Sequence, residues 1–232
     1  MTERHFVIAI DGPAASGKSS TAPRVARRLG YSHVDSGSLY RAATAAQLAA
    51  GPADESWTEA DVLVAARRVT LATSETGFVP LIDGAPCEET LRGAEVTRHV
   101  SRVAQMPLVR AWVNAQVRAT STVRSIVVDG RDMGTIVFPD ADLKVFLVAD
   151  PWERARRRLI QRLHRAPTDP EIAEETDLIV HRDAKDATQT VQATDAVLID
   201  TTSLTQADQV ERIVALAKAV THRPADTSAM NR

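Results

Sequence analysis

The sequence predicts a doubly wound α/β fold, a parallel sheet with helices on both faces. Four short apolar runs lead to an aspartate, at Asp11, Asp129, Asp150 and Asp200, and a shorter run covers 33–35. Uninterrupted runs rich in β-branched residues are typical of strands buried on both faces of a parallel sheet. Helical patterns alternate with these runs, and that alternation indicates parallel strand order. We therefore expect five strands.

The helical segments are expected between and after these strands, at about 17–29, 37–50, 94–120 with a break before Pro107, 151–165, 170–187 and 204–220. Residues 58–105 interrupt the rhythm. A helical stretch there is followed by two short strand-like pieces with a turn at Asp83–Gly84. More than 80 residues separate Arg41 from Asp129, which is too many for one crossover connection. An inserted α+β lobe is the economical explanation.

Composition excludes several classes of protein. The chain has 232 residues, 44% hydrophobic and 25% charged, with a formal net charge of −2, as in an ordinary globular protein. This charge argues against a protein that coats nucleic acid or an anionic membrane. No apolar run reaches the ~18 residues that span a bilayer, and the opening residues "MTER" do not resemble a secretory signal. We expect a cytoplasmic, monomeric protein with no nucleic-acid or membrane partner.

A phosphate-binding motif follows the first strand and opens the first helix. Gly12, Gly17, Lys18 and Ser19 match G-x-x-x-x-G-K-[ST]. The glycines allow successive backbone N–H groups to turn toward phosphate oxygens, and the helix N-terminus adds its positive dipole end. Lys18 is expected to reach the β- and γ-phosphates, and Ser19 to ligate Mg²⁺. The predicted ATP-binding residues are Gly12, Pro13, Ala14, Ala15, Ser16, Gly17, Lys18, Ser19 and Ser20.

Other motifs narrow the class of P-loop protein. The guanine-reading N-K-x-D motif is impossible, because neither of the two asparagines, Asn114 and Asn231, precedes a lysine. The chain has no Gly-Gly pair, so a transporter-type signature loop is missing, and it is short for a mechanical ATPase. A small P-loop kinase that uses ATP and Mg²⁺ is the leading prediction.

Two arginines indicate the acceptor. Arg41 follows the second strand and Arg131 follows the strand that ends at Asp129. Both are expected at the carboxyl edge of the sheet, where the P-loop also lies. Guanidinium groups there can bind a phosphate with two parallel hydrogen bonds. For either residue alone, a surface salt bridge is the better interpretation.

Four stretches together are similar to the cytidylate kinases of bacteria: "IAIDGPAASGKSS", "DSGSLYR", "VSRVAQMPLVR" and "VDGRDMGTIVFPDADLKVFL". The resemblance runs from residue 6 to about residue 200. It implies a five-stranded parallel P-loop kinase core with an inserted nucleoside-monophosphate-binding lobe and a helical lid. The activity it implies is transfer of a phosphoryl group from ATP to CMP or dCMP, in pyrimidine nucleotide metabolism.

The resemblance also assigns acceptor residues. It implies that Ser36 bonds the bound nucleotide, that Arg41 and Arg131 bind its phosphate, and that Ser101 and Arg110, with Asp132 beside them, read cytosine. A guanidinium and a carboxylate suit cytosine, since O2 and N3 accept hydrogen bonds and the exocyclic amine donates.

The family motif R-D-x-x-D-x-x-R is matched only in part. Arg182 and Asp186 are present and are implied to reach the sugar and phosphates, but Gln189 stands where an arginine is expected. The following loop is about four residues shorter than in the family. Gln189 can donate a hydrogen bond to a base carbonyl but brings no charge, so this departure bears on base selectivity.

The segment at about 152–187 is predicted to be the lid. It is rich in arginine, and Arg154, Arg158 and Arg162 share one helical face. Arginines that close over a transferring phosphoryl group stabilise its negative charge. For any single one, a solvated basic helix explains the pattern as well. We expect Arg154 and Arg158, with Lys18 and Arg131, to be the catalytic cations.

The predicted organisation is one domain over residues 1–222. Its core covers about 1–57 and 106–222, the inserted lobe about 58–105, and residues 223–232 form a disordered tail. Two alternatives remain open: a kinase for UMP or a small metabolite hydroxyl, for which Asp35 would be the candidate base, and a nucleotide-binding regulator.

Overall fold

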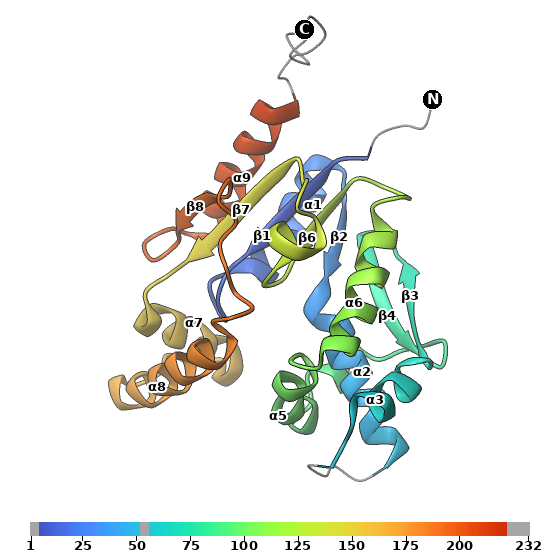
Figure 1. The fold of residues 1–232 in the computed structure, drawn as a ribbon. Helices are drawn as coiled ribbons and strands as arrows, with labels where there is room; N and C mark the ends of the chain where they lie inside the picture. Colours follow the sequence, from blue (N-terminus) through green and yellow to red (C-terminus); the bar gives the residue numbers. More distant parts are fainter. Residues whose placement is uncertain (1–4, 52–55, 222–232) are drawn as a thin grey trace, which may run out of the picture.

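The structure is a computed structural model that describes residues 5–51 and 56–221 (Figure 1). The predicted disordered tail lies outside the described residues. Within them, one eight-stranded sheet is formed by β1 (Val7–Asp11), β2 (Ser32–Asp35), β3 (Val69–Thr73), β4 (Gly77–Ile82), β5 (Ala85–Pro86), β6 (Ile126–Asp129), β7 (Leu143–Val148) and β8 (Val197–Asp200).

The five predicted parallel strands are confirmed, in the order β2-β6-β1-β7-β8. One strand end differs from the prediction. β7 ends at Val148, and Asp150 instead caps the next helix, where its carboxylate accepts hydrogen bonds from the amides of Trp152 and Glu153 at 2.9 and 3.3 Å. The apolar run continued past the last paired residue, so the pattern placed the strand end two residues late.

Helices cover both faces of the sheet. They are α1 (Lys18–Leu29), α2 (Ser36–Ala50), α3 (Glu59–Ala66), α4 (Glu88–Leu91), α5 (Ala94–Val103), α6 (Pro107–Thr120), α7 (Pro151–Leu163), α8 (Asp169–Asp186) and α9 (Gln206–Thr221), with one wide helical turn, η1 (Met133–Val137). The segment expected at 94–120 is indeed divided before Pro107, into α5 and α6.

The core is divided by the sheet into two layers. All five residues of β1 are buried, and alternate side chains point to opposite faces. Ile8 and Ile10 pack with the apolar side of α1 and α9, whereas Val7 and Ala9 belong to the cluster formed by α2, α3, α5 and α6. This burial fixes the carboxyl ends of the strands, where the site lies.

The segment predicted as an inserted lobe contains α3, β3, β4, β5, α4 and α5. Its strands extend the core sheet, because β4 pairs parallel to β2 and antiparallel to β3 and β5. The predicted turn joins β4 to β5, with positive φ angles of 51° at Asp83 and 78° at Gly84. The division into core and lobe stays a prediction.

Helices α7 and α8 form a hairpin with a small core of their own, made of Ala155, Leu159, Ile172 and Ile179. Ala15 of the P-loop packs against this cluster. In Figure 1 the hairpin lies on one side of the molecule, with α5 and α3 on the other. No helix in the described ranges is long and apolar enough to cross a membrane.

Candidate active site

The P-loop connects β1 to α1 and needs glycine at two positions. Gly12 has a φ of 146°, and a Cβ there would lie 2.1 Å from the carbonyl oxygen of Leu147. Gly17, which precedes α1, has a φ of 101° and approaches the side chain of Gln209, whose Oε1 would be 2.7 Å from a Cβ. Only glycine meets both conditions without displacing its neighbours, so the loop is held tightly against β7 and α9.

The backbone of this loop is suited to an anion. In the described part of the chain, the amides of Gly17, Lys18 and Ser19 donate to no protein acceptor. They lie at the start of α1, where unpaired N–H groups and the helix dipole favour negative charge. The buried hydroxyl of Ser16 also has no hydrogen-bond partner among the described residues. These donors fit the phosphates of a nucleotide.

Lys18 is buried against the same loop. Its ammonium group donates to the carbonyl oxygens of Gly12 and Pro13, both at 2.7 Å. Burial, with the positive charge of Arg131 as the second cause, lowers the pKa of Lys18 to about 8. An anionic ligand bound beside this lysine would stabilise its charged form, which burial and Arg131 disfavour.

The strand-end carboxylates have different roles. Asp11 accepts from the amides of Met133 and Gly134 at 2.8 and 2.7 Å, and burial raises its pKa to about 6. It therefore holds η1. Asp129 faces the P-loop, where its Oδ2 accepts from the Ser19 hydroxyl at 3.1 Å.

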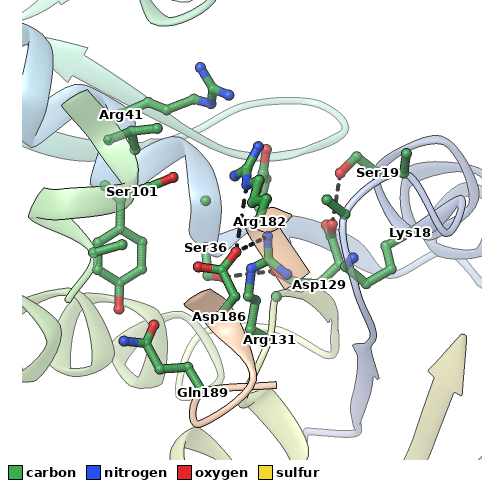
Figure 2. A pocket seen from close by; sticks show the side chains of 18 of the residues that line it. Lys18, Ser19, Ser36, Arg41, Ser101, Asp129, Arg131, Arg182, Asp186 and Gln189 are labelled. Atoms are coloured by element: carbon green, nitrogen blue, oxygen red, sulfur yellow. Dashed lines mark hydrogen bonds and ion pairs between the residues drawn. The ribbon is translucent and has the colours of Figure 1, made fainter. Parts of the chain in front are cut away.

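Ser19 and Asp129 fit the requirements of a magnesium ion. Both offer the hard oxygen ligands that Mg²⁺ prefers, and Mg²⁺ in kinases is commonly held by one or two protein groups together with substrate phosphates. The hydroxyl of Ser19 and Oδ2 of Asp129 lie side by side at the edge of the phosphate cradle (Figure 2). No group of three or more potential metal ligands of the His, Cys, Asp or Glu type occurs among the described residues.

A cleft of about 500 Å³ extends from this cradle toward α5 and α6. In Figure 2, Lys18 and Ser19 lie on one side of it, and Arg41 and Ser101 on the other. The predicted residues that line the cleft are Ala14, Ala15, Gly17, Lys18, Ser19, Ser20, Ser36, Arg41, Ser101, Arg110, Arg131, Asp132, Arg158, Arg182, Asp186 and Gln189. Gly12, Pro13, Ser16 and Arg154 are not among its lining residues.

The middle of the cleft holds an ionic cluster. The guanidinium group of Arg131 lies 2.9 Å from Oδ2 of Asp186, and Nε of Arg182 is 3.5 Å from the same oxygen. Burial lowers the pKa of Arg131. Arg41 donates from Nη1 to the carbonyl oxygen of Leu91 at 2.9 Å. The remaining donors of these arginines can bind a phosphate.

Arg110 and Asp132 form an ion pair at the far end of the cleft. Nη1 of Arg110 also donates to Oε1 of Gln189 at 2.9 Å, and its guanidinium carbon lies 5.8 Å from the ring centre of Tyr40. Ser36 donates to the backbone oxygen of Asp129 at 2.8 Å and keeps its acceptor lone pairs. Gln189, the departure from the family motif, thus lies beside the pair that is predicted to read the base.

The two predicted lid cations differ in their surroundings. Arg154 is buried and donates to the carbonyl oxygen of Ala14 at 3.0 Å, with Asp183 at 2.7 Å. It binds the hairpin to the P-loop. Arg158 lines the cleft and lies 3.1 Å from Glu175. Contact of either residue with a transferring phosphate stays a prediction.

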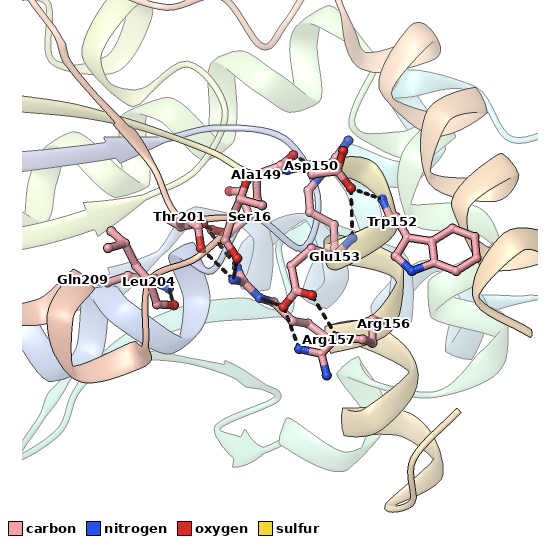
Figure 3. A network of polar contacts seen from close by, with 12 residues as sticks. Ser16, Ala149, Asp150, Trp152, Glu153, Arg156, Arg157, Thr201, Leu204 and Gln209 are labelled. Atoms are coloured by element: carbon pink, nitrogen blue, oxygen red, sulfur yellow. Dashed lines mark hydrogen bonds and ion pairs between the residues drawn. The ribbon is translucent and has the colours of Figure 1, made fainter. Parts of the chain in front are cut away.

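Sequence reasoning missed Tyr40 and Arg157, which also line the cleft. Figure 3 shows that Arg157 joins α7 to the loop after β8. Its guanidinium group donates to the carbonyl oxygen of Thr201 at 2.6 Å and to Glu153 at 2.9 Å. Thr201 in turn donates to the carbonyl oxygen of Ser16 at 3.1 Å. The arginine-rich sequence of α7 indicated that some of its side chains contact the site, but it did not show which arginine faces the loop after β8.

Comparison with known proteins decides the family. The profile of the family described as "Cytidylate kinase" matches residues 8–219. The chain belongs to the cytidylate kinase family. The cytidylate kinase of Geobacillus kaustophilus (strain HTA426) is 42% identical to it over 217 residues, 91% of this chain and 96% of that protein. That of Lactiplantibacillus plantarum (strain ATCC BAA-793 / NCIMB 8826 / WCFS1) is 38% identical over 235 residues, 98% of this chain and 100% of that protein.

A gluconokinase from Sinorhizobium meliloti 1021 is similar in structure with a TM-score of 0.48 and 15% identity, covering 94% of this chain and 95% of that one. A likeness at this level says nothing about the acceptor. Membership of the cytidylate kinase family rests on the sequence relatives.

Proposed function

We propose that this protein transfers the γ-phosphoryl group of MgATP to CMP or dCMP, giving ADP and CDP or dCDP. ATP binds with its phosphates on the P-loop, and the acceptor binds across the cleft. The attacking oxygen belongs to a phosphate that is already anionic, so the reaction needs positive charge and exclusion of water more than it needs a base.

The observation that carries this proposal is the pair formed by Arg110 and Asp132 at the far end of the cleft. A guanidinium group donates to O2 and N3 of cytosine, while a carboxylate accepts from the exocyclic amine. Uracil presents an oxygen where cytosine has that amine, so it would face the carboxylate without a hydrogen bond. A hydroxyl acceptor such as shikimate would use neither group.

The catalytic work falls to cations between the two nucleotides. Lys18 lies on the donor side, and Arg131 lies near enough for its charge to lower the pKa of that lysine. Together they stabilise the charge that spreads over the oxygens of the transferring group. A magnesium ion held at Ser19 and Asp129 supplies further neutralisation when bound. Arg158, on the hairpin, adds a further positive charge to the lining of the cleft.

We further propose that the enzyme acts as a cytoplasmic monomer in pyrimidine nucleotide metabolism, without a nucleic-acid or membrane partner. The net charge of −2 supports the lack of a nucleic-acid or anionic-membrane partner, since a polyanion-binding surface needs an excess of basic residues. A nucleotide-binding regulator would bind ATP tightly and turn over slowly with every monophosphate.

The test is ADP production by the purified protein with MgATP and each of CMP, dCMP, UMP, AMP, GMP and shikimate. Strong turnover with CMP and dCMP is expected, and release of inorganic phosphate without acceptor should be slow. Preference for UMP would leave the kinase assignment intact, but it would refute the proposed recognition of cytosine by Arg110 and Asp132. ADP production that does not depend on any acceptor would refute the proposal.

A further inference from the structure

The carboxylate beside the predicted magnesium site is held from its other side by a histidine. Nε2 of His33, on β2, lies 2.7 Å from Oδ1 of Asp129, while the Ser19 hydroxyl bonds Oδ2 at 3.1 Å. An ionised carboxylate only accepts hydrogen bonds, so Nε2 is the donor. Each oxygen of Asp129 therefore has its own partner.

The surrounding strands leave Asp129 little freedom except at its carboxylate. Its backbone is fixed in β6, where it pairs with Ile10 of β1 and Asp35 of β2, and its carbonyl oxygen accepts from Ser36 at 2.8 Å. The terminal torsion of an aspartate is a broad, soft rotation. A fixed donor on Oδ1 is what sets that torsion and directs Oδ2 toward Ser19.

His33 is also well placed to be that fixed donor. Its side chain is 18% exposed and that of Asp129 is 3% exposed, so water competes poorly for the bond. The residue lies on a strand paired in parallel with β6 on one side and β4 on the other.

The other strand-end aspartates near the P-loop have different partners: Asp11 accepts from the amides of η1, and Asp35 caps α2 by accepting from the amide of Ser38. Asp129 alone of the three faces Ser19.

We propose that His33 is a positioning residue for the magnesium site, which holds Asp129 so that its Oδ2 faces Ser19 and the ion. This inference rests on the proposed function, since it takes the ion to be part of the donor complex. Groups that orient a metal-binding carboxylate commonly change metal affinity by about 10- to 100-fold when removed.

The experiment compares His33→Leu and His33→Gln with wild type. Leucine removes the donor, whereas the glutamine amide nitrogen can take the place of Nε2. His99→Leu is the matched control, because His99 is 16% exposed and lies on α5 beside Trp57 and Glu95. Two quantities are measured: the Mg²⁺ concentration that gives half-maximal CMP-dependent turnover, and ATP affinity by calorimetry with and without Mg²⁺.

For His33→Leu we expect the half-maximal Mg²⁺ concentration to rise about 10-fold and the gain in ATP affinity on adding Mg²⁺ to shrink by a similar factor. Affinity for ATP without Mg²⁺ and KM for CMP should stay within about twofold of wild type, and His33→Gln should restore most of the Mg²⁺ effect. If His33→Leu does not fold, His33→Asn replaces it, because its shorter amide cannot reach Asp129.

An unchanged Mg²⁺ dependence in a folded variant that lacks the donor, or an equal change in His99→Leu, would overturn the inference. So would a glutamine variant no better than the leucine variant. These results differ from failure of the proposed function, in which wild type itself would show no CMP-dependent turnover at any Mg²⁺ concentration.

Discussion

Arg41 is half-buried on the side of the cleft where we propose that the acceptor binds, and among the described residues only one of its guanidinium nitrogens makes hydrogen bonds. Nη1 donates to the carbonyl oxygen of Leu91 and to the hydroxyl of Thr97 at 2.9 and 3.1 Å. Burial lowers its pKa. These two bonds hold the side chain in place and leave the other nitrogens available to a phosphate.

We predict that Arg41→Ala raises KM for CMP by about 10-fold or more, since a charge-assisted bond to a phosphate is worth about 1.5–3 kcal/mol. KM for ATP should change by less than about twofold. Steady-state kinetics with each substrate varied checks this, and Arg24→Ala, an exposed position on α1, should change neither value. A variant that mainly loses ATP affinity would contradict the placement of the acceptor.

Some contacts in the cleft could not be predicted from the residues that neighbour them in the sequence. The P-loop was predictable because its glycines meet a backbone requirement that can be read from spacing. The bond between Arg110 and Gln189 joins residues 79 positions apart. It forms because the turn after α8 lies beside Arg110 of α6 in the folded chain, and no periodicity along the chain encodes that approach. The stacking of Arg110 on Tyr40 likewise depends on tertiary packing.

At the level of elements, α2 begins at a carboxylate that is costly to ionise. Asp35 caps the helix by accepting from the amide of Ser38 at 3.2 Å. Burial, and then repulsion from Asp129, raises its pKa to about 6 from an ordinary value of 3.8. The folded protein therefore binds a proton here more tightly than the unfolded chain does. The stability from this group is complete below about pH 4 and is lost as the pH rises through 6.

Asp35→Asn removes this charge and keeps the cap, because asparagine caps helices as well as aspartate. We predict that the free energy of unfolding of the variant, relative to that of wild type, rises by about 1–3 kcal/mol as the pH is raised from 4 to 8. Urea denaturation across that range in EDTA measures it. Asp61→Asn is a control of opposite sign, since the hydroxyl of Thr58 lowers the pKa of that exposed carboxyl. A difference for Asp35→Asn that does not vary with pH would be inconsistent with the raised pKa.

The order of elements was easier to predict than their pairing. Strand and helix alternation predicted the parallel core, and the apolar runs located its strands. The pairing of β4 with β2 could not be predicted, because it rests on two register pairs, His33 with Gly77 and Val34 with Phe78. Gly77 is required there, since a Cβ would lie 2.1 Å from the carbonyl oxygen of His33. A single glycine in a strand pattern does not identify its partner.

Considered as a whole, the molecule has the P-loop at one end of the cleft and Arg110 with Asp132, for which we propose recognition of the base, at the other, with the α7–α8 hairpin beside them (Figures 1 and 2). The hairpin contacts the P-loop through Arg154, and reaches the loop after β8 through Arg157. Both contacts join it to backbone oxygens, so its position is coupled to the nucleotide site. A cleft bounded in this way favours transfer to a phosphate over transfer to water.

Selection of cytosine through Asp132, as we propose, is tested by kcat/KM for CMP and for UMP in wild type and in Asp132→Asn. We predict that wild type prefers CMP by at least about 100-fold, because O4 of uracil would face a carboxylate oxygen of Asp132 with no hydrogen between the two acceptors. In Asp132→Asn the amide can donate to the O4 of uracil, so the ratio should fall by about 10-fold or more, while Asp140→Asn, at an exposed position, should leave it unchanged. A ratio that is the same in wild type and Asp132→Asn would show that Asp132 does not select cytosine.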